Sequence, residues 1–240
     1  MKPLVFGVAV LALAVALNWS GVARAQNAHK SYPAMAPLSE YRMSSRNDEI
    51  SLARSAAPPS ISAHAGVLVL GARGYEFAAT GTNGWVCFVE RSWASGFDDR
   101  EFWNPKERSP NCFNPIAART ELPRYLKLTQ WVLAGVSKAQ MVVRTKAAIA
   151  DRTFKAPEAG AIAYMLSKNG YLNDAMGGPW LPHIMFFVPR GQAPNWGAGK
   201  DGSPVIGADG SELETTVFFI PVRRWSDGSP GPQPAVAHKM

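Results

Sequence analysis

The sequence predicts an α+β fold: a mostly antiparallel sheet with a helical hairpin packed on one face, in a single domain. Short β-branched and aromatic runs bounded by Pro and Gly, typical of strands, occur in both halves of the chain. Residues 121–152 carry apolar residues at the spacing of two amphipathic helices. The strand runs at 67–90 and 161–220 need each other to cover their apolar faces, which argues for one domain over residues 38–226.

Residues 1–25 are predicted to be a secretory signal peptide of bacterial type. Lys2 precedes an uncharged apolar run of 13 residues that ends at Leu17, and Ala23-Arg24-Ala25 offers a cleavage site. The run is shorter than the roughly 18 to 20 residues that a transmembrane helix needs. We therefore expect a periplasmic or secreted protein, cleaved near Ala25-Gln26, with no transmembrane segment in the mature chain.

The composition is that of an ordinary globular protein, with 47% hydrophobic and 18% charged residues. Removal of Lys2 and Arg24 with the signal peptide lowers the net charge from +7 to +5. A basic surface suits nucleic acid, anionic lipid or acidic glycan, and export makes nucleic acid the least suitable of these. The partners we expect are a small molecule or an anionic envelope component.

The two cysteines, Cys87 and Cys112, are predicted to form a disulfide, because an even pair in an oxidising compartment is normally bonded. The chain has no C-x-x-C motif, so neither a thiol redox centre nor haem attachment is indicated.

In chain order, residues 26–37 lack periodicity and are predicted to be a flexible lead-in. A helical turn at 39–43 precedes a helix that Ser45 or Asn47 caps and that ends before Pro58. A β-meander follows, with strands at 67–70, 75–79 and 85–90. Asn83-Gly84 is the strongest hairpin signal in the chain and is expected to join the last two strands.

Residues 92–119 are predicted to be a long irregular loop whose aromatic side chains pack down on the sheet; a recognition loop is the alternative. The helical hairpin then occupies 121–152, with Gly135 ending its first helix and Ser137 capping its second. Residues 119–155 carry a local charge of +6, which is interpreted either as a patch for anionic headgroups or as a solvated helix face.

Two look-alike strands, 182–189 and 215–221, each contain a Phe-Phe pair and end on a proline. Their continuous apolar character predicts that both faces are covered, which places them at the centre of the sheet. A short strand at 161–166 precedes them, and a Gly-rich loop at 190–214 separates them. Residues 227–240 are predicted to be a disordered tail.

If these two strands pair antiparallel, Trp180, His183, Arg223 and Trp225 gather at one rim of the sheet, and Trp196 lies at the opposite rim. Tryptophans with a few polar groups suit a small-ligand or glycan site. The alternative is that the tryptophans close the ends of the core.

No catalytic, metal or cofactor signature is present, and no cofactor is expected. His183 is the weak catalytic candidate, with Asp174 or Glu90 as a carboxylate partner. Asp98, Asp99 and Glu101 form a solvated cluster or a carboxylate site. The leading hypothesis is a non-catalytic binding protein for a small molecule or envelope component. The alternatives are a secreted hydrolase that uses a histidine–carboxylate pair and a structural envelope protein that binds a protein partner.

Overall fold

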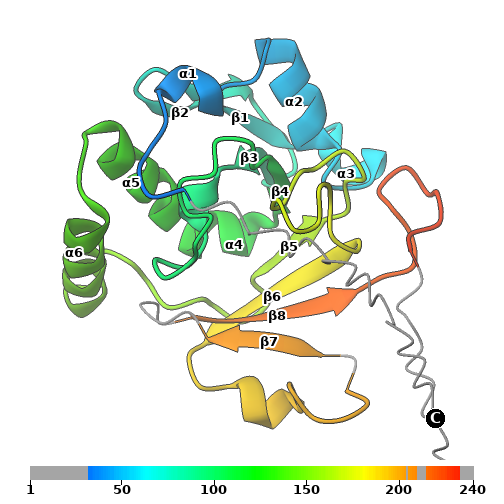
Figure 1. Ribbon diagram of the computed structural model, residues 1–240. Helices are drawn as coiled ribbons and strands as arrows, with labels where there is room; N and C mark the ends of the chain where they lie inside the picture. Colours follow the sequence, from blue (N-terminus) through cyan, green and yellow to red (C-terminus); the bar gives the residue numbers. More distant parts are fainter. Residues whose placement is uncertain (1–31, 204, 210–214, 233–240) are drawn as a thin grey trace, which may run out of the picture.

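The computed structural model describes residues 32–203, 205–209 and 215–232. One eight-stranded sheet crosses the molecule in the order β2-β1-β3-β4-β5-β6-β8-β7 (Figure 1). All neighbouring strands in it are antiparallel except β1 and β3. The strands are β1 (Gly66–Gly71), β2 (Gly74–Ala79), β3 (Val86–Glu90), β4 (Ser109–Phe113), β5 (Ile162–Met165), β6 (His183–Pro189), β7 (Ile206–Asp209) and β8 (Thr215–Pro221).

The helices come from the first two thirds of the chain. They are α1 (Leu38–Tyr41), α2 (Arg46–Arg54), α3 (Pro59–Ser62), α4 (Pro115–Thr120), α5 (Leu122–Leu133) and α6 (Lys138–Ala150), with 3-10 turns η1 (Ser92–Ala94) and η2 (Ala193–Trp196). Ser45 caps α2, as predicted, by accepting a hydrogen bond from the backbone N–H of Asp48. The predicted signal peptide lies outside the described residues.

Helices cover both faces of the first half of the sheet. Val67 and Val69 of β1 and the Cys87–Cys112 pair face α2 and pack with its Ala53. The alternate residues Leu68, Phe88 and Phe113 face the other way and pack with Tyr125 of α5. Because side chains alternate along a strand, these two clusters lie on opposite faces, and we call them the α2 face and the α5 face.

The predicted fold class is confirmed: the helices and a mostly antiparallel sheet form one compact α+β domain (Figure 1). Both helices of the predicted hairpin form, with Gly135 at φ +71° between them and a capping box at Ser137. Helix α5 lies on the sheet. Met141 and Ala148 of α6 join the cluster that contains Trp131 of α5. Packing of both helices as one unit on the sheet stays a prediction.

The two look-alike strands are not central. β6 and β8 pair antiparallel, with His183 opposite Pro221, but they are sixth and seventh in the sheet, and β4 and β5 occupy its middle. The prediction rested on their continuous apolar sequence, which is typical of strands that are buried on both faces. In β6, His183, Met185 and Phe187 are buried, whereas the residues between them are half-buried. The α2 face is therefore only partly covered at this end of the sheet.

The hairpin predicted at Asn83-Gly84 is wrong. β1 pairs with β2, and β3 runs parallel to β1 on its other side, so residues 80–85 form a crossover. Asn83 shapes this crossover: its Oδ1 accepts a hydrogen bond from the Trp85 N–H, and its Nδ2 donates one to the Ile61 carbonyl oxygen. Such Asx contacts bend the backbone in many loop types, so the dipeptide did not determine which strands pair.

The loop predicted over 92–119 contains a strand of the sheet and a short helix, β4 and α4. Pro110 lies within β4, and proline usually argues against an interior strand. Here it is accommodated because β5 pairs only with Cys112 and Phe113, beyond the proline. The described aromatic residues of the segment pack down as predicted: Trp93 and Phe102 are buried in a cluster with α5.

Candidate functional site

A cavity of about 540 Å³ opens on the α5 face, where the second half of the sheet extends past the helices. Its floor is made by β6, β8 and β7, its roof by α5 and the loop after η1, and one side by the 172–180 loop. The lining residues are mostly apolar, with a few charged groups among them. They are Glu90, Ala94, Ser95, Gly96, Asp98, Glu107, Arg124, Tyr125, Met165, Leu172, Met176, Trp180, His183, Met185, Phe187, Ile206, Val217 and Phe219.

Strand register explains which side chains reach the cavity. Met185 lies opposite Phe219 and Phe187 lies opposite Val217, so these four side chains share the α5 face. The β5 residue Met165 pairs with His183 on the same face. Wide, mostly apolar hollows with a few polar groups are the usual form of a small-molecule site.

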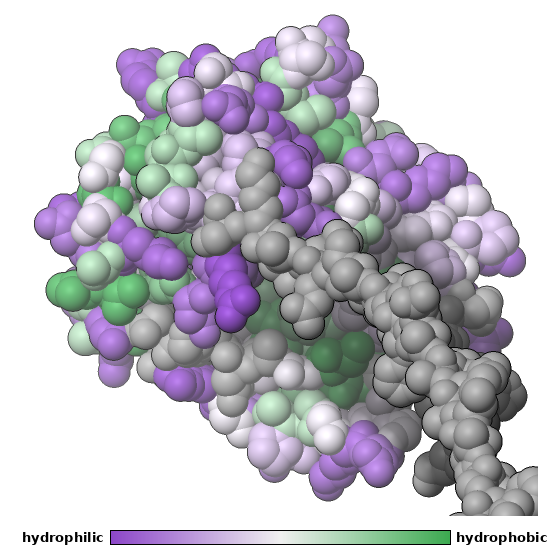
Figure 2. All heavy atoms as spheres, in the orientation of Figure 1, coloured by the Kyte–Doolittle hydropathy of each residue, from purple (hydrophilic) through white to green (hydrophobic). Residues whose placement is uncertain are grey.

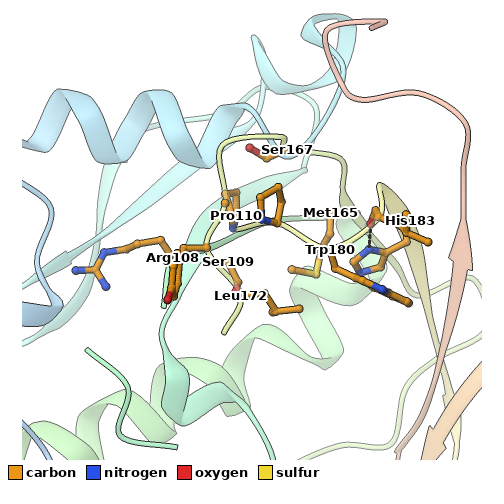
Figure 3. A pocket seen from close by; sticks show the side chains of 12 residues that line it. Arg108, Ser109, Pro110, Met165, Ser167, Leu172, Trp180 and His183 are labelled. Atoms are coloured by element: carbon orange, nitrogen blue, oxygen red, sulfur yellow. Dashed lines mark hydrogen bonds between the residues drawn. The ribbon is translucent and has the colours of Figure 1, made fainter. Parts of the chain in front are cut away.

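Trp180 and His183 stand together at one end of this cavity, and they also line a second, much smaller cavity of about 30 Å³ (Figure 3). Their ring centroids are 4.8 Å apart, and the His183 ring is 5.6 Å from that of Phe219. Arg108, also on the small cavity, extends away from this pair in the close-up. The structure therefore brings together two of the five predicted binding residues, Trp180 and His183.

The surroundings of His183 favour its neutral imidazole form. Its side chain is almost fully buried, and burial lowers its pKa below the ordinary value. The Nδ1 atom lies 2.7 Å from the Leu181 carbonyl oxygen, which favours the tautomer in which Nδ1–H donates this hydrogen bond (dashed in Figure 3). Nε2 is then the acceptor.

The histidine–carboxylate pair of the hydrolase hypothesis lacks its carboxylate in the described part of the chain, where no hydrogen bond or ion pair joins His183 to an acid. Asp174 is instead bound by Tyr32, Tyr171 and Lys106, at 2.7, 2.5 and 2.7 Å. Glu90 accepts a hydrogen bond of 2.6 Å from Asn111 Nδ2.

The other three predicted binding residues lie away from this cavity. Trp196, 43% exposed, stacks on Phe218 on the α2 face with ring centroids 4.7 Å apart. Arg223 is exposed just beyond β8. Trp225 is half-buried in a turn, where its backbone N–H donates to the Ser229 carbonyl oxygen. Trp180, Trp196 and Trp225 therefore do not form one site, nor are these three buried in one core.

Two charged cavity residues, Glu107 and Arg124, did not stand out in the sequence. Glu107 is 4% exposed and precedes β4, the strand that the sequence did not predict because it contains Pro110. Arg124 is buried, although the sequence counts it among the basic residues of a helical face. The sequence offers Glu90 only as a possible partner of His183. Its position, as a charged residue that ends the otherwise apolar run of β3, is the signal that points to a functional role.

Three other basic residues of the 119–155 segment contact an acid or an aromatic ring, and the anion-binding patch there stays a prediction. Arg119 pairs with Glu158, the Arg144 guanidinium lies 5.9 Å from the Trp131 ring centroid, and the Lys138 ammonium lies 5.2 Å from that of Phe102. Figure 2 shows mostly polar side chains on this face, with hydrophobic ones exposed over α6 and beside β7. Val143 of α6 and Ile206 of β7 are among the large hydrophobic residues that are exposed. The described part of this face shows no single large apolar patch of the kind that would favour a protein partner.

The predicted disulfide is present: Cys87 and Cys112 lie opposite each other on β3 and β4 and are bonded. No helix in the described ranges combines the length and the apolar character needed to cross a membrane. No family model, curated protein or solved structure matches the chain.

Proposed function

We propose that this chain is an exported, non-catalytic protein that binds a small, mostly apolar molecule in the cavity on the α5 face. The observation that carries the proposal is the cavity itself, with walls of Met185, Phe187, Val217 and Phe219. Burial of apolar surface provides roughly 25 cal/mol for each Å² removed from water. A hollow of about 540 Å³ is large enough to enclose most of a small ligand.

Export is supported by the disulfide, which is typical of oxidising compartments, and by the predicted signal peptide. Expression of the full chain in a bacterium should yield a periplasmic or secreted protein that begins at Gln26. Intact mass measurement of the fractionated protein checks this. A chain that keeps residues 1–25 would contradict it.

The binding test is a thermal-shift screen of the mature, oxidised protein against fatty acids, long-chain amines, aromatic amino acids and peptidoglycan fragments. A ligand at about 100 times its Kd should stabilise the protein by roughly 2.7 kcal/mol. For a domain of this size the melting temperature should then rise by about 5 to 10 °C.

Val217→Trp fills the cavity from the β8 floor and should abolish the shift given by any hit. Val188→Trp is the matched control, because Val188 is a half-buried β6 residue that points to the α2 face. A flat screen, or a shift that survives in Val217→Trp, would overturn the proposal.

A further inference from the structure

Two buried carboxylates face the cavity beside its apolar floor. Glu90 ends β3 and is 9% exposed, and Glu107 precedes β4 and is 4% exposed. Each accepts a hydrogen bond from a neutral side chain: Glu90 from Asn111 Nδ2 at 2.6 Å, and Glu107 from Ser109 Oγ at 3.1 Å. Neither takes part in an ion pair among the described residues.

The surroundings of these carboxylates disfavour their negative charge. Burial, followed by the charge of Glu90, raises the pKa of Glu107 well above its usual range. Burial also raises the pKa of Glu90 to about 7. A buried carboxylate without an ion-pair partner either takes up a proton or gains a cation. The cavity offers room for that cation.

Arg124 is the one Arg or Lys side chain on the described lining, and its charge acts on two nearby acids, Glu90 and Glu121. Its guanidinium carbon lies 4.3 Å from the Tyr125 ring centroid, and its charge offsets only part of the rise that burial gives to the pKa of Glu90 and Glu121. Its Nε atom is buried and has no hydrogen-bond partner in the described part of the chain. The other polar lining groups add no positive charge, since burial lowers the pKa of His183 and Asp98 at the cavity edge is acidic.

We infer that the ligand of this cavity is an apolar amine, whose ammonium group binds between Glu90 and Glu107 while its apolar body lies against Met185, Phe187 and Phe219. This inference rests on the proposed function and adds the charge of the ligand. The aromatic ring of Trp180 on the same lining further favours a cation, because ring faces attract positive charge.

A bare divalent metal ion fits this site less well. Calcium takes six to eight oxygen ligands, and the part of the chain that the structure describes contains no group of three or more acids, histidines or cysteines arranged to hold a metal. The large apolar floor would also remain without a function.

The test compares three probes with one apolar body and different polar ends: 4-phenylbutylamine, 4-phenylbutan-1-ol and 4-phenylbutanoate. Their Kd values for the mature, oxidised protein are measured by isothermal titration calorimetry at pH 7.5. A charge-assisted hydrogen bond strengthens binding by about tenfold or more relative to a neutral partner. The amine should therefore bind at least about tenfold more tightly than the alcohol, and the carboxylate most weakly.

Glu107→Gln and Glu90→Gln keep the shape of the side chains and remove their charge. Each should raise the Kd of the amine about tenfold or more and change that of the alcohol less than threefold. Glu158→Gln is the control, since Glu158 is an exposed partner of Arg119 outside the cavity. It should leave all three Kd values unchanged.

The outcomes separate the ligand charge from the existence of the site. If the alcohol or the carboxylate binds as tightly as the amine, or if both Gln variants bind the amine normally, the amine inference is overturned. In that case the cavity would still be the binding site, provided that Val217→Trp abolishes the binding of the probes. If no probe binds, or if Val217→Trp binds all three unchanged, the proposed function fails as well.

Discussion

At the scale of single residues, the most heavily buried ion pair in the described part of the chain lies outside the cavity lining. Arg91 Nη2 lies 2.8 Å from Glu49 Oε1, and both side chains are buried. Glu49 Oε1 also accepts a hydrogen bond from the Leu70 N–H, and Arg91 donates to the Tyr41 carbonyl oxygen. The pair thus ties α2 and the last residue of α1 to β1 and to the end of β3.

Glu49→Gln should cost about 3 to 5 kcal/mol of unfolding free energy, because it leaves the Arg91 charge buried without a counter-ion. Urea denaturation measures this loss. The matched control is Glu76→Gln, which breaks the exposed Arg46–Glu76 pair and should cost less than about 1 kcal/mol. Equal effects of the two substitutions would contradict the assigned role of burial.

The raised pKa of Glu90 predicts a stability that falls as pH rises. Its folded pKa of about 7 exceeds the unfolded value of 4.5, so the folded state binds more protons between these values and up to about pH 8. From pH 6.5 to 8 the loss from Glu90 is about 1 kcal/mol, and Glu107 adds to it in the same direction. His183 acts in the opposite direction and mainly below pH 6.5, because its folded pKa is lowered.

Urea denaturation at pH 6.5 and pH 8 checks this prediction in the wild type and in Glu90→Gln. The variant should lose less stability over this interval, while Glu158→Gln should behave as the wild type does. A wild-type stability that rises with pH over the same interval would contradict the prediction.

At the scale of elements, local patterns predicted most helices and strands but not their partners. The cap at Ser45 and the strands β1, β2 and β3 agree with the sequence, and β6 and β8 pair in the antiparallel sense that the sequence analysis took as a condition. Asn83-Gly84 led to a wrong hairpin prediction, and Pro110 lies in a strand that was predicted as loop. Turn chemistry and proline act locally, whereas the whole sheet decides which strands are neighbours. The sequence did not predict Glu107 and Arg124 as cavity residues for the same reason, since their burial depends on elements that are distant in sequence.

The disulfide joins two adjacent strands near the middle of the sheet, with a sequence separation of 25 residues. Replacing Cys87 and Cys112 together by Ala should lower the unfolding free energy by roughly 3 to 4 kcal/mol, because the unfolded chain regains the entropy of the closed loop. Denaturation of the double variant beside the oxidised wild type measures this. Reduction of the wild type should give a similar loss, and a loss under about 1 kcal/mol in both would contradict the prediction.

At the scale of the whole molecule, the continuous sheet makes both halves of the chain parts of one core. β4 pairs with β5 across the middle, and Phe113 of β4 packs edge-on against Phe187 of β6 with ring centroids 5.5 Å apart. Neither half can therefore bury its apolar face alone. The cavity lies on the same sheet, so ligand binding should stabilise the molecule as a whole.

This continuity predicts a single cooperative unfolding transition. Trp93 reports on the cluster with α5 and Trp225 on the turn after β8, so tryptophan fluorescence samples both ends of the described fold. Its urea midpoint should coincide with that of far-UV circular dichroism, as two-state behaviour requires. In Trp225→Phe only the remaining tryptophans report on unfolding. The fluorescence and circular dichroism midpoints of this variant should still coincide. Separate midpoints would show that the chain folds as two units and would place the cavity at the boundary between them, because its lining draws Glu90 and Arg124 from one half and Phe187 and Phe219 from the other.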